Sequence, residues 1–239
     1  MVDWCNVPCF VGIGPDVVHR VEDSAHALHY QAGATIFEEG DACAGFHLVA
    51  DGLVRIYRIS QEGRMHTLSL LRPPATFNEV AAVDGGVNPY NAVAVTAATI
   101  LRISHEHLME LLANERDLLQ NYVQALAQVN RKYIERLEDM TFRTIPSRLA
   151  KLFLYETSYA DTIAEAPTTL TQEEIAAILG TTREVVGRAL RALLNAGLLR
   201  KKGREVYIVD RDGLEYLAAT NEMPREPVAR VCKARTPTR

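Results

Sequence analysis

Residues 171–195, with the sequence TQEEIAAILGTTREVVGRALRALLN, constrain the fold of this chain more than any other stretch. Thr171, followed three positions later by Glu174, forms a capping-box pattern, which predicts that a helix begins here. Gly180 predicts the end of that helix, because the residue after a helix often adopts a left-handed conformation that glycine tolerates. Thr182 is then placed to cap a second helix. We therefore expect two short helices joined by a tight turn.

The second expected helix separates apolar and charged side chains. Val186, Leu190 and Leu193 recur at helical spacing and are expected to face a core. The opposite face carries Arg183, Glu184, Gly187, Arg188 and Arg191. Arginine can bond the O6 and N7 atoms of guanine, and a carboxylate can accept a hydrogen bond from the N4 amine of cytosine. An exposed helix surface, held by an i, i+4 pair of Glu184 and Arg188, is the alternative reading.

The residues after this helix favour nucleic-acid binding. Gly197 is expected to end the helix, and residues 198–209 have the pattern of two strands joined by a turn at Lys202 and Gly203. Positive charge lies at the tip of this hairpin, where a phosphate backbone would run, on Arg200, Lys201, Lys202 and Arg204. The capping box, the turn glycine, the Arg-Glu pair and the basic hairpin together predict a winged helix-turn-helix.

Charge is unevenly distributed along the chain. The 239 residues carry a formal net charge of −4, which by itself argues against a polyanion-binding protein. Residues 1–142 have a net charge of −8, however, whereas residues 143–239 have a net charge of +4. We therefore expect a nucleic acid to meet the C-terminal part.

No apolar run approaches the roughly 18–20 residues that span a membrane, and no leader is recognisable, so a cytoplasmic protein without membrane contact is expected.

Short apolar runs separated by glycines dominate residues 28–103. Four turn glycines recur at intervals of about 7–12 residues, the rhythm of an antiparallel sandwich or barrel: Gly33, Gly40, Gly52 and Gly63. The stretch FNEVAAVDGGVNPYN, at residues 77–91, interrupts the strands and is expected to form a short helical turn and a loop. A helix is expected before the strands, at residues 10–26. These patterns predict a barrel that encloses a cavity.

A long helical region is predicted from Ser104, which can cap a helix, to Met140. Its second part spaces apolar residues by three or four positions, close to the heptad rhythm of a coiled coil: Tyr122, Leu126, Val129, Tyr133, Leu137 and Met140. A helix of about 20 residues extends ~30 Å, and a chain of this size could not cover such a stripe along its length. We expect a homodimer interface; packing on the chain's own barrel is the alternative.

The expected class is therefore α+β, with an N-terminal antiparallel β-barrel, a long dimerisation helix and a C-terminal winged helix-turn-helix. We place the sensor barrel and its N-terminal helix at residues 1–104, the dimerisation region at 105–142 and the DNA-binding domain at 143–219. A hinge is expected at residues 141–146, because Pro146 suits the first turn of a new helix. The Pro- and Arg-rich residues 220–239 are expected to be disordered.

The chain resembles the cyclic-AMP receptor protein / fumarate-nitrate regulator (CRP/FNR) family of bacterial transcription factors over nearly its whole length. The segments AGATIFEEGD and FHLVADGLVRIYR are similar to the family's sensor barrel, a jelly roll of the cyclic-nucleotide-binding kind. TQEEIAAILGTTREVVGRAL is similar to the family's DNA-binding signature. The resemblance implies a homodimeric transcription regulator, with double-stranded DNA and RNA polymerase as partners and activation of transcription as one role.

The resemblance also implies roles for single residues. Arg183, Glu184 and Arg188 match the family's base-reading residues, and Arg183 implies half-sites similar to TGTGA in an inverted repeat. Thr171, Gln172 and Thr182 match its phosphate contacts, and we expect the same role for Arg191, Lys201 and Lys202.

The expected effector pocket departs from the cyclic-nucleotide pattern. Its residues are Glu79, Asn78, Tyr90, Asn91, Tyr133 and Ile134. The sequence PYN replaces the family's Arg-Ser pair, which holds the cyclic phosphate, and no Lys or Arg occurs at residues 80–101. Glu79 keeps the ribose-binding acid, but Asn78 replaces a glycine. Because a buried phosphate without a basic partner costs several kcal/mol, cyclic AMP is not expected to be the effector.

Other effector classes stay open. Haem needs an axial ligand, and the available histidines are His19, His26, His29, His47 and His66. An iron–sulfur cluster needs four thiolates, which the spacing of Cys5, Cys9, Cys43 and Cys232 does not favour. Another small ligand, or none, is the remaining class.

The pair His105 and His107 suits a capping turn better than a metal site, and no enzymatic activity is expected. A ligand-binding barrel with a vestigial DNA-binding head is the main alternative function.

Overall fold

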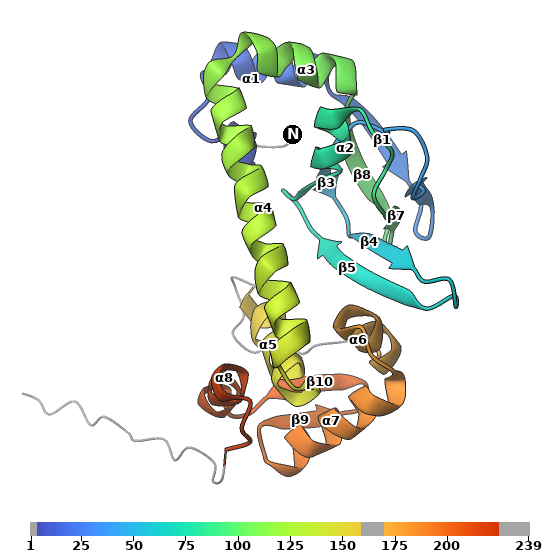
Figure 1. Cartoon of the computed structure of the whole chain (residues 1–239), viewed down its shortest axis with the longest axis vertical. Coiled ribbons are helices and arrows are strands. Elements are labelled where there is room, and N and C mark those ends of the chain that lie inside the picture. The colour runs from blue at the N-terminus through green and yellow to red at the C-terminus, as the bar shows by residue number, and fades with distance from the viewer. Residues whose placement is uncertain (1–3, 159–169, 225–239) are drawn as a thin grey trace, which may run out of the picture. The chain divides into compact units, whose positions relative to one another are not determined.

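The computed structural model describes residues 4–158 and 170–224 and divides the chain into two compact units (Figure 1). The first unit comprises Met1–Arg136 and the second comprises Leu137–Arg239. The predicted α+β class is confirmed, because antiparallel sheets, a long helix and a helical C-terminal unit with a β-hairpin follow one another. The predicted tail lies outside the described residues from residue 225 onward.

Two antiparallel four-stranded sheets form the jelly roll of the first unit. One sheet has the order β1-β8-β3-β6 and consists of His26–Tyr30, Ala98–Ile103, Phe46–Asp51 and Thr76–Phe77. The other has the order β2-β7-β4-β5 and consists of Thr35–Phe37, Asn91–Ala94, Val54–Ile59 and Met65–Leu71. The turn before β4 requires glycine, because Gly52 has a φ of +89° and an added Cβ would lie 2.4 Å from the Ala97 carbonyl oxygen.

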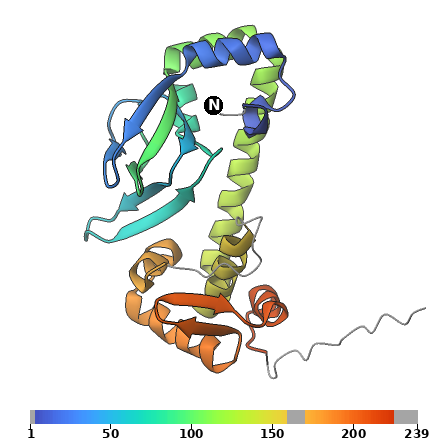
Figure 2. The ribbon, with the colours of Figure 1, turned by 180° about the vertical axis from the view of Figure 1, so that it is seen from behind.

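Helices pack at one end of this sandwich (Figures 1 and 2). They are α1 (Pro15–Ser24), α2 (Glu79–Asp84), α3 (His105–Asn114) and the first part of α4 (Arg116–Phe142). The helix expected at residues 10–26 is shorter than predicted, since two short 3₁₀ turns, Trp4–Asn6 and Pro8–Phe10, precede it. The long helical region expected from Ser104 is interrupted at Glu115, whose backbone is extended. Ser104 caps α3 as predicted, accepting a hydrogen bond from the His107 amide.

Aromatic side chains fill part of the interior between the two sheets. The Phe37 ring lies 5.9 Å from the centroids of both Phe77 and Tyr90, and His47 stacks on Phe77 at 4.9 Å. All four side chains are buried. Large rings with complementary faces therefore pack in this part of the interior, and the cavity expected inside the barrel stays a prediction.

Some apolar residues of helix α4 are buried in the chain's own core, and others are exposed to solvent. Tyr122 is only 2% exposed, its ring packs on Phe46 at 6.0 Å, and its hydroxyl donates to the Glu79 carbonyl at 2.9 Å. Leu126 is partly buried against the same core. Tyr122 is thus not available to a second chain, and its assignment to a dimer interface is wrong, because spacing alone does not identify the surface that a helix meets.

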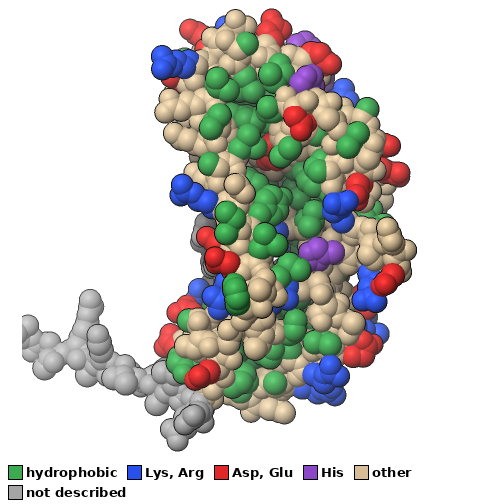
Figure 3. Space-filling view, viewed as in Figure 1, with side chains coloured by type: hydrophobic (Ala, Val, Ile, Leu, Met, Phe, Trp, Pro, Cys, Tyr) green, Lys and Arg blue, Asp and Glu red, His purple; other side chains and the backbone are tan. Residues whose placement is uncertain are grey.

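A different set of apolar side chains of α4 is exposed, and Figure 3 shows hydrophobic side chains gathered along this helix. The exposed set is Leu119, Val123, Tyr133, Ile134, Leu137, Met140 and Phe142. Positions 119, 123, 126, 130, 133, 137 and 140 alternate in steps of four and three, which is an unbroken heptad register. We call this set of positions the α4 seam. It contains one polar residue, Asn130.

The second unit consists of helices and one antiparallel hairpin. It contains α5 (Ile145–Ser158), α6 (Gln172–Leu179), α7 (Arg183–Asn195), β9 (Leu199–Lys202), β10 (Glu205–Ile208) and α8 (Arg211–Thr220). Its core is formed by the apolar faces of these elements, with Phe153, Ile175, Leu193 and Leu214 among the buried side chains. The predicted helix–turn–helix followed by a hairpin is present, and β9 and β10 are antiparallel.

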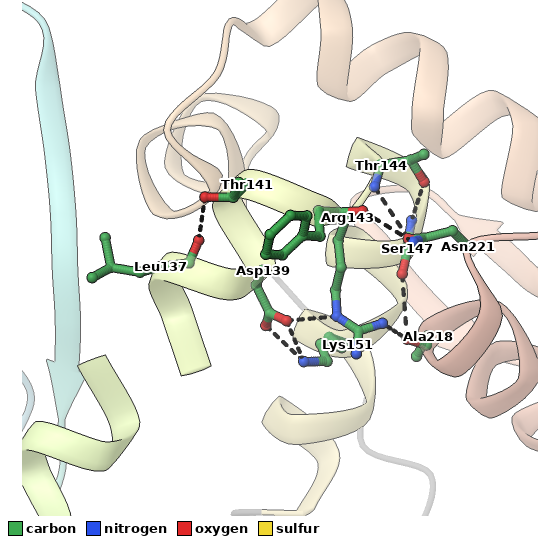
Figure 4. A network of polar contacts seen from close by, with 10 residues as sticks. Leu137, Asp139, Thr141, Arg143, Thr144, Ser147, Lys151, Ala218 and Asn221 are labelled. Atoms are coloured by element: carbon green, nitrogen blue, oxygen red, sulfur yellow. Dashed lines mark hydrogen bonds and ion pairs between the residues drawn. The ribbon is translucent and has the colours of Figure 1, made fainter. Parts of the chain in front are cut away.

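The segment expected to act as a hinge, residues 141–146, is held by side chains of the second unit (Figure 4). Only residues 143–144 separate α4 from α5. Asn221 donates from Nδ2 to the Phe142 carbonyl at 3.1 Å and accepts from the Thr144 amide at 3.2 Å. The Arg143 guanidinium donates to the Ala218 carbonyl. These bonds argue against a free hinge at this place.

Among the described residues, no helix is long and apolar enough to cross a membrane. Within the same ranges, no three His, Cys, Asp or Glu side chains gather in a way that would hold a metal ion.

Candidate nucleic-acid interface

A groove of about 340 Å³ lies along the exposed face of α7. It is lined by Gln172 from α6 and by Arg183, Glu184, Gly187, Arg188 and Arg191 from α7. The structure therefore brings together the three predicted base readers and two of the predicted phosphate contacts. We call this site the α7 groove.

The orientation of α7 follows from its apolar face. Val186, Ala189, Leu190 and Leu193 are buried in the core of the second unit, so the charged residues between them are turned outward. Arg183, Glu184 and Arg188 are all exposed. A face with this charge pattern can donate to guanine edges and accept from a cytosine amine.

The two predicted caps are present. The Thr171 hydroxyl accepts from the Glu174 amide at 3.2 Å, and the Glu174 carboxylate accepts from the Thr171 amide at 2.8 Å, which completes the capping box. Gly180 then ends α6 with a φ of 61°, as its sequence position predicts. Thr182 caps α7 by accepting from the Val185 amide at 3.5 Å. Thr171 and Thr182 therefore already have a structural role in the free protein.

The helix terminus also affects Glu184. Hydrogen bonding to its own backbone amide at the start of α7, and to Thr182, holds the pKa of the Glu184 carboxyl below its usual range. The nearby Arg183 and Arg188 act in the same direction. Glu184 is therefore ionised at neutral pH and can only accept hydrogen bonds from a bound base.

The hairpin carries exposed positive charge beside this groove's helix. Lys201 and Lys202 are exposed, as predicted for phosphate contacts. The Arg200 guanidinium lies 5.9 Å from the centre of the Tyr207 ring, whose hydroxyl donates to Glu205 at 2.6 Å. Tyr207 and Glu205 were not identified from the sequence, although an aromatic residue opposite an arginine in a two-residue hairpin is a recognisable signal.

Arg148 is a second residue that the sequence did not reveal. It lies on α5 and its guanidinium donates to the carbonyl of Leu179, the last residue of α6. Burial lowers the pKa of Arg148, and the carboxylate of Asp139 opposes that shift. Because the contact joins residues 31 positions apart, no local pattern could have predicted it.

Two of the expected effector residues in the first unit, Asn78 and Tyr90, are hydrogen-bonded to each other. Asn78 is buried, has a φ of 65° and donates its amide N–H to the Tyr90 hydroxyl at 2.6 Å. Its side-chain Nδ2 donates to the Gly45 carbonyl and to Asn88, both at 3.0 Å. Asn88, which was not identified from the sequence, is fully buried at the centre of this network.

The remaining pocket residues have different surroundings. Asn91 accepts from the Glu39 amide at 3.1 Å and thus ties β7 to a neighbouring loop. Glu79 accepts from the Thr76 hydroxyl at 2.6 Å, and burial raises its pKa. Tyr133 is 40% exposed, and burial together with the nearby Glu79 carboxylate raises the pKa of its phenol, so the structure brings Tyr133 near Glu79. Ile134 is 50% exposed.

Two of the candidate haem and cluster ligands, His47 and Cys9, are buried. His47 is 1% exposed and its Nδ1 lies 2.9 Å from the Gly45 carbonyl oxygen. Burial lowers its pKa to about 4. The Cys9 thiol is buried, which raises its pKa to about 12, whereas cluster ligands are thiolates. Cys232 lies outside the described residues.

Comparison with known proteins adds independent observations. Residues 27–115 match the family model for the cyclic nucleotide-binding domain, and residues 147–217 match that for the Crp-like helix-turn-helix domain. The cyclic AMP receptor protein of Thermus thermophilus is 30% identical over 214 residues, which cover 88% of this chain and 96% of that protein. The CRP-like cAMP-activated global transcriptional regulator of Mycobacterium tuberculosis is 27% identical, covering 86% of this chain and 93% of the relative.

Comparison with solved structures identifies regulators of the same kind as the sequence relatives do. The catabolite activator protein of Thermus thermophilus is 29% identical, with a TM-score of 0.52 and coverage of 88% of this chain and 98% of its own. A transcriptional regulator of the CRP/FNR family from the same organism is 25% identical, with a TM-score of 0.68 and coverage of 83% and 100%. These relatives are similar to this chain through both of its units.

Proposed function

Since this chain belongs to the CRP/FNR family of DNA-binding transcription regulators, we propose that it acts as a homodimer on TGTGA-like inverted repeats. We further propose that an effector other than cyclic AMP controls it through the first unit. The single observation that carries the proposal is the α7 groove, in which Arg183, Glu184 and Arg188 lie together on an exposed helix face.

The spacing of the two arginines fits the proposed half-site. Arg183 and Arg188 are five residues apart, or about 7.5 Å along a helix axis. The two guanines of TGTGA are two base-pair steps apart, or about 6.8 Å along DNA. Each guanidinium can therefore meet one guanine, while Glu184 accepts from a cytosine of the complementary strand.

Phosphate contacts would fix α7 in the major groove. Gln172 and Arg191 line the rim of the α7 groove, and Lys201 and Lys202 extend from the hairpin. Thr171 and Thr182 cap helices, and the free amides at those helix starts favour a phosphate oxygen. Such contacts position the protein without reading sequence.

The homodimer is supported by the α4 seam. Leu137, Val123 and Met140 are 63%, 56% and 49% exposed in the single chain, which is unusual for a long apolar stripe in water. A second copy of α4 in the same register would cover these side chains. Two DNA-binding units joined in this way match a DNA site with two-fold symmetry, whose half-sites lie about one helical turn apart.

The argument against cyclic AMP rests on the chemistry around Glu79. Burial raises the pKa of Glu79, and the buried phenol of Tyr90 lies where the family has its phosphate-binding arginine and serine. An added phosphate would meet a carboxyl group and phenols rather than a cation, so its burial would be uncompensated. An uncharged small ligand is compatible with these surroundings, and haem is compatible if its two propionate carboxylates reach solvent.

Fluorescence anisotropy with labelled DNA tests the proposal. The purified protein is titrated into a TGTGA inverted repeat with half-site centres one turn apart, and into a scrambled duplex of equal composition, with and without cyclic AMP. Selective binding that cyclic AMP does not strengthen is the expected result. Equal binding to both duplexes would favour the vestigial head, and a large gain with cyclic AMP would overturn the effector proposal. A visible spectrum of the same sample tests for haem through its Soret band.

A further inference from the structure

Gly187 occupies the centre of the α7 groove. It lies inside helix α7, and the residues around it on the same face are Arg183, Glu184, Arg188 and Arg191. Glycine inside a helix is less favourable than alanine, because it gives up more backbone freedom on folding. Its presence at this position therefore requires a compensating reason.

The folded chain does not supply that reason through backbone or packing. Gly187 has no positive φ, and an added Cβ would meet within 4 Å only the side-chain tip of Gln172, with Oε1 at 3.3 Å. This tip belongs to a long, flexible side chain that can move aside. A methyl group would thus fit the free protein.

Gly213 in α8, the other described glycine in a helix of this unit, provides the contrast. A Cβ there would lie 2.6 Å from both Leu198 Cδ2 and Asp210 Oδ2, and the residue is buried. Packing against its own fold explains Gly213. Space for something outside the chain is the explanation left for Gly187.

The position of Gly187 identifies what needs that space. Gly187 lies four residues after Arg183 and one before Arg188, between the two groups proposed to meet the two guanines of TGTGA. The base between those guanines is thymine, whose 5-methyl group projects into the major groove. We infer that Gly187 is a specificity-determining residue that receives this thymine methyl group against the bare backbone of α7.

This inference rests on the proposed function and makes the site more specific. A methyl group on the protein at position 187 would collide with the methyl group on the DNA. It would hold α7 away from the base edges, while the longer lysine and arginine side chains could still reach phosphates. The loss should therefore fall on specific binding far more than on binding to random DNA.

The test pairs a protein methyl group with a DNA methyl group. Gly187→Ala should weaken binding to the TGTGA repeat by about tenfold and binding to scrambled DNA by less than about twofold. Replacing the middle thymine of each half-site by uracil removes the DNA methyl group, and it should restore most of the affinity of Gly187→Ala. The wild-type protein should gain nothing from uracil.

Controls separate this idea from its competitors. Gly187→Ala should unfold at a higher temperature than the wild type, which removes misfolding as the cause of weaker binding. Asn195→Ala, an exposed change in the same helix outside the α7 groove, should bind like the wild type. In a Gln172→Ala background the Gly187→Ala loss should persist; its disappearance would mean that Gly187 only seats Gln172, and would overturn the inference.

The outcomes are distinguishable from failure of the proposed function. Wild-type protein that does not prefer the TGTGA repeat would refute the proposed function itself. Wild-type protein with that preference, together with a Gly187→Ala variant of unchanged affinity, would refute only this inference. A loss that uracil does not relieve would also refute the thymine assignment.

Discussion

The carboxylate of Asp139 accepts hydrogen bonds from Lys151 Nζ at 2.6 and 2.7 Å, joining the last turns of α4 to α5 (Figure 4). Arg143 Nε donates to the same carboxylate at 2.5 Å. One turn earlier in α4, Arg136 instead donates to the Leu68 carbonyl in β5 of the first unit. The boundary between the two units, at residues 136 and 137, therefore lies within α4 rather than at the expected hinge.

Replacing Asp139 should destabilise the second unit. Asp139→Ala leaves Lys151 and Arg143 without their anionic partner in a half-buried place, so unfolding should be easier by about 1–3 kcal/mol. Urea unfolding of the full chain, followed by circular dichroism, measures the change. Glu138→Ala removes an equal charge from the exposed neighbouring residue and should have little effect. Equal losses in both variants would show that net charge, not the contact, is responsible.

Local signals explain what could be predicted from the sequence. The capping box of Thr171 and Glu174 and the left-handed Gly180 act within a few residues, so α6, the turn and α7 could be located to within one or two positions. The face of α7 followed from spacing alone, which is why Arg183, Glu184 and Arg188 were found together. Such features depend on the backbone of one element.

Contacts between residues far apart in the sequence could not be predicted from local patterns. Tyr122 fits the apolar spacing of α4 as well as Val123 does, yet only its packing on Phe46 decides that it is buried. Asn221 bonds to residues 77 and 79 positions away, although the sequence predicts that it lies in a disordered tail. Arg148 and Asn88 also form hydrogen bonds with residues far away in the sequence. A sequence pattern shows which face is apolar, but it does not identify the partner surface.

His47 should make the first unit sensitive to acid. Burial lowers its pKa to about 4, whereas an unfolded histidine has a pKa of about 6.5. The unfolded state therefore binds the extra proton first, and the stability that neutral His47 contributes is present above pH 6.5 and lost as pH falls toward 4. The full shift corresponds to about 3 kcal/mol.

Thermal unfolding of the full chain between pH 7.5 and 4.5 measures this loss. His47→Phe should unfold with a weaker dependence on pH over the range, because its ring fits among Phe37 and Phe77 without titrating. His29→Ala, at an exposed position of β1, should keep the pH dependence of the wild type. The same pH dependence in His47→Phe as in the wild type would assign the acid sensitivity to other groups.

Substitutions of base-reading and of phosphate-contacting residues should affect binding to the TGTGA repeat and to scrambled DNA differently. Arg183→Ala and Arg188→Ala should each reduce discrimination between the TGTGA repeat and scrambled DNA by about 1–3 kcal/mol. Lys202→Ala should weaken binding to both duplexes about equally and reduce the slope of log affinity against log salt by about 0.9 per contact. Anisotropy titrations at several salt concentrations measure both quantities. Losses of equal size on the two duplexes for Arg183→Ala would contradict its assignment to base reading.

Asn130 should fix the register of the proposed dimer. It is the one polar residue in the α4 seam, at a position equivalent to those of Val123 and Leu137. A single asparagine at such a position weakens a two-stranded coiled coil but restricts it to one register and one oligomeric state. Asn130→Val should therefore tighten self-association while admitting larger oligomers, and sedimentation equilibrium measures both effects.

Leu137→Asp, which places a charge in the seam, should give monomers, whereas Val209→Asp, at an exposed apolar residue outside the seam, should not. Monomers in the wild type, or Leu137→Asp dimers as stable as those of the wild type, would place the dimer interface elsewhere.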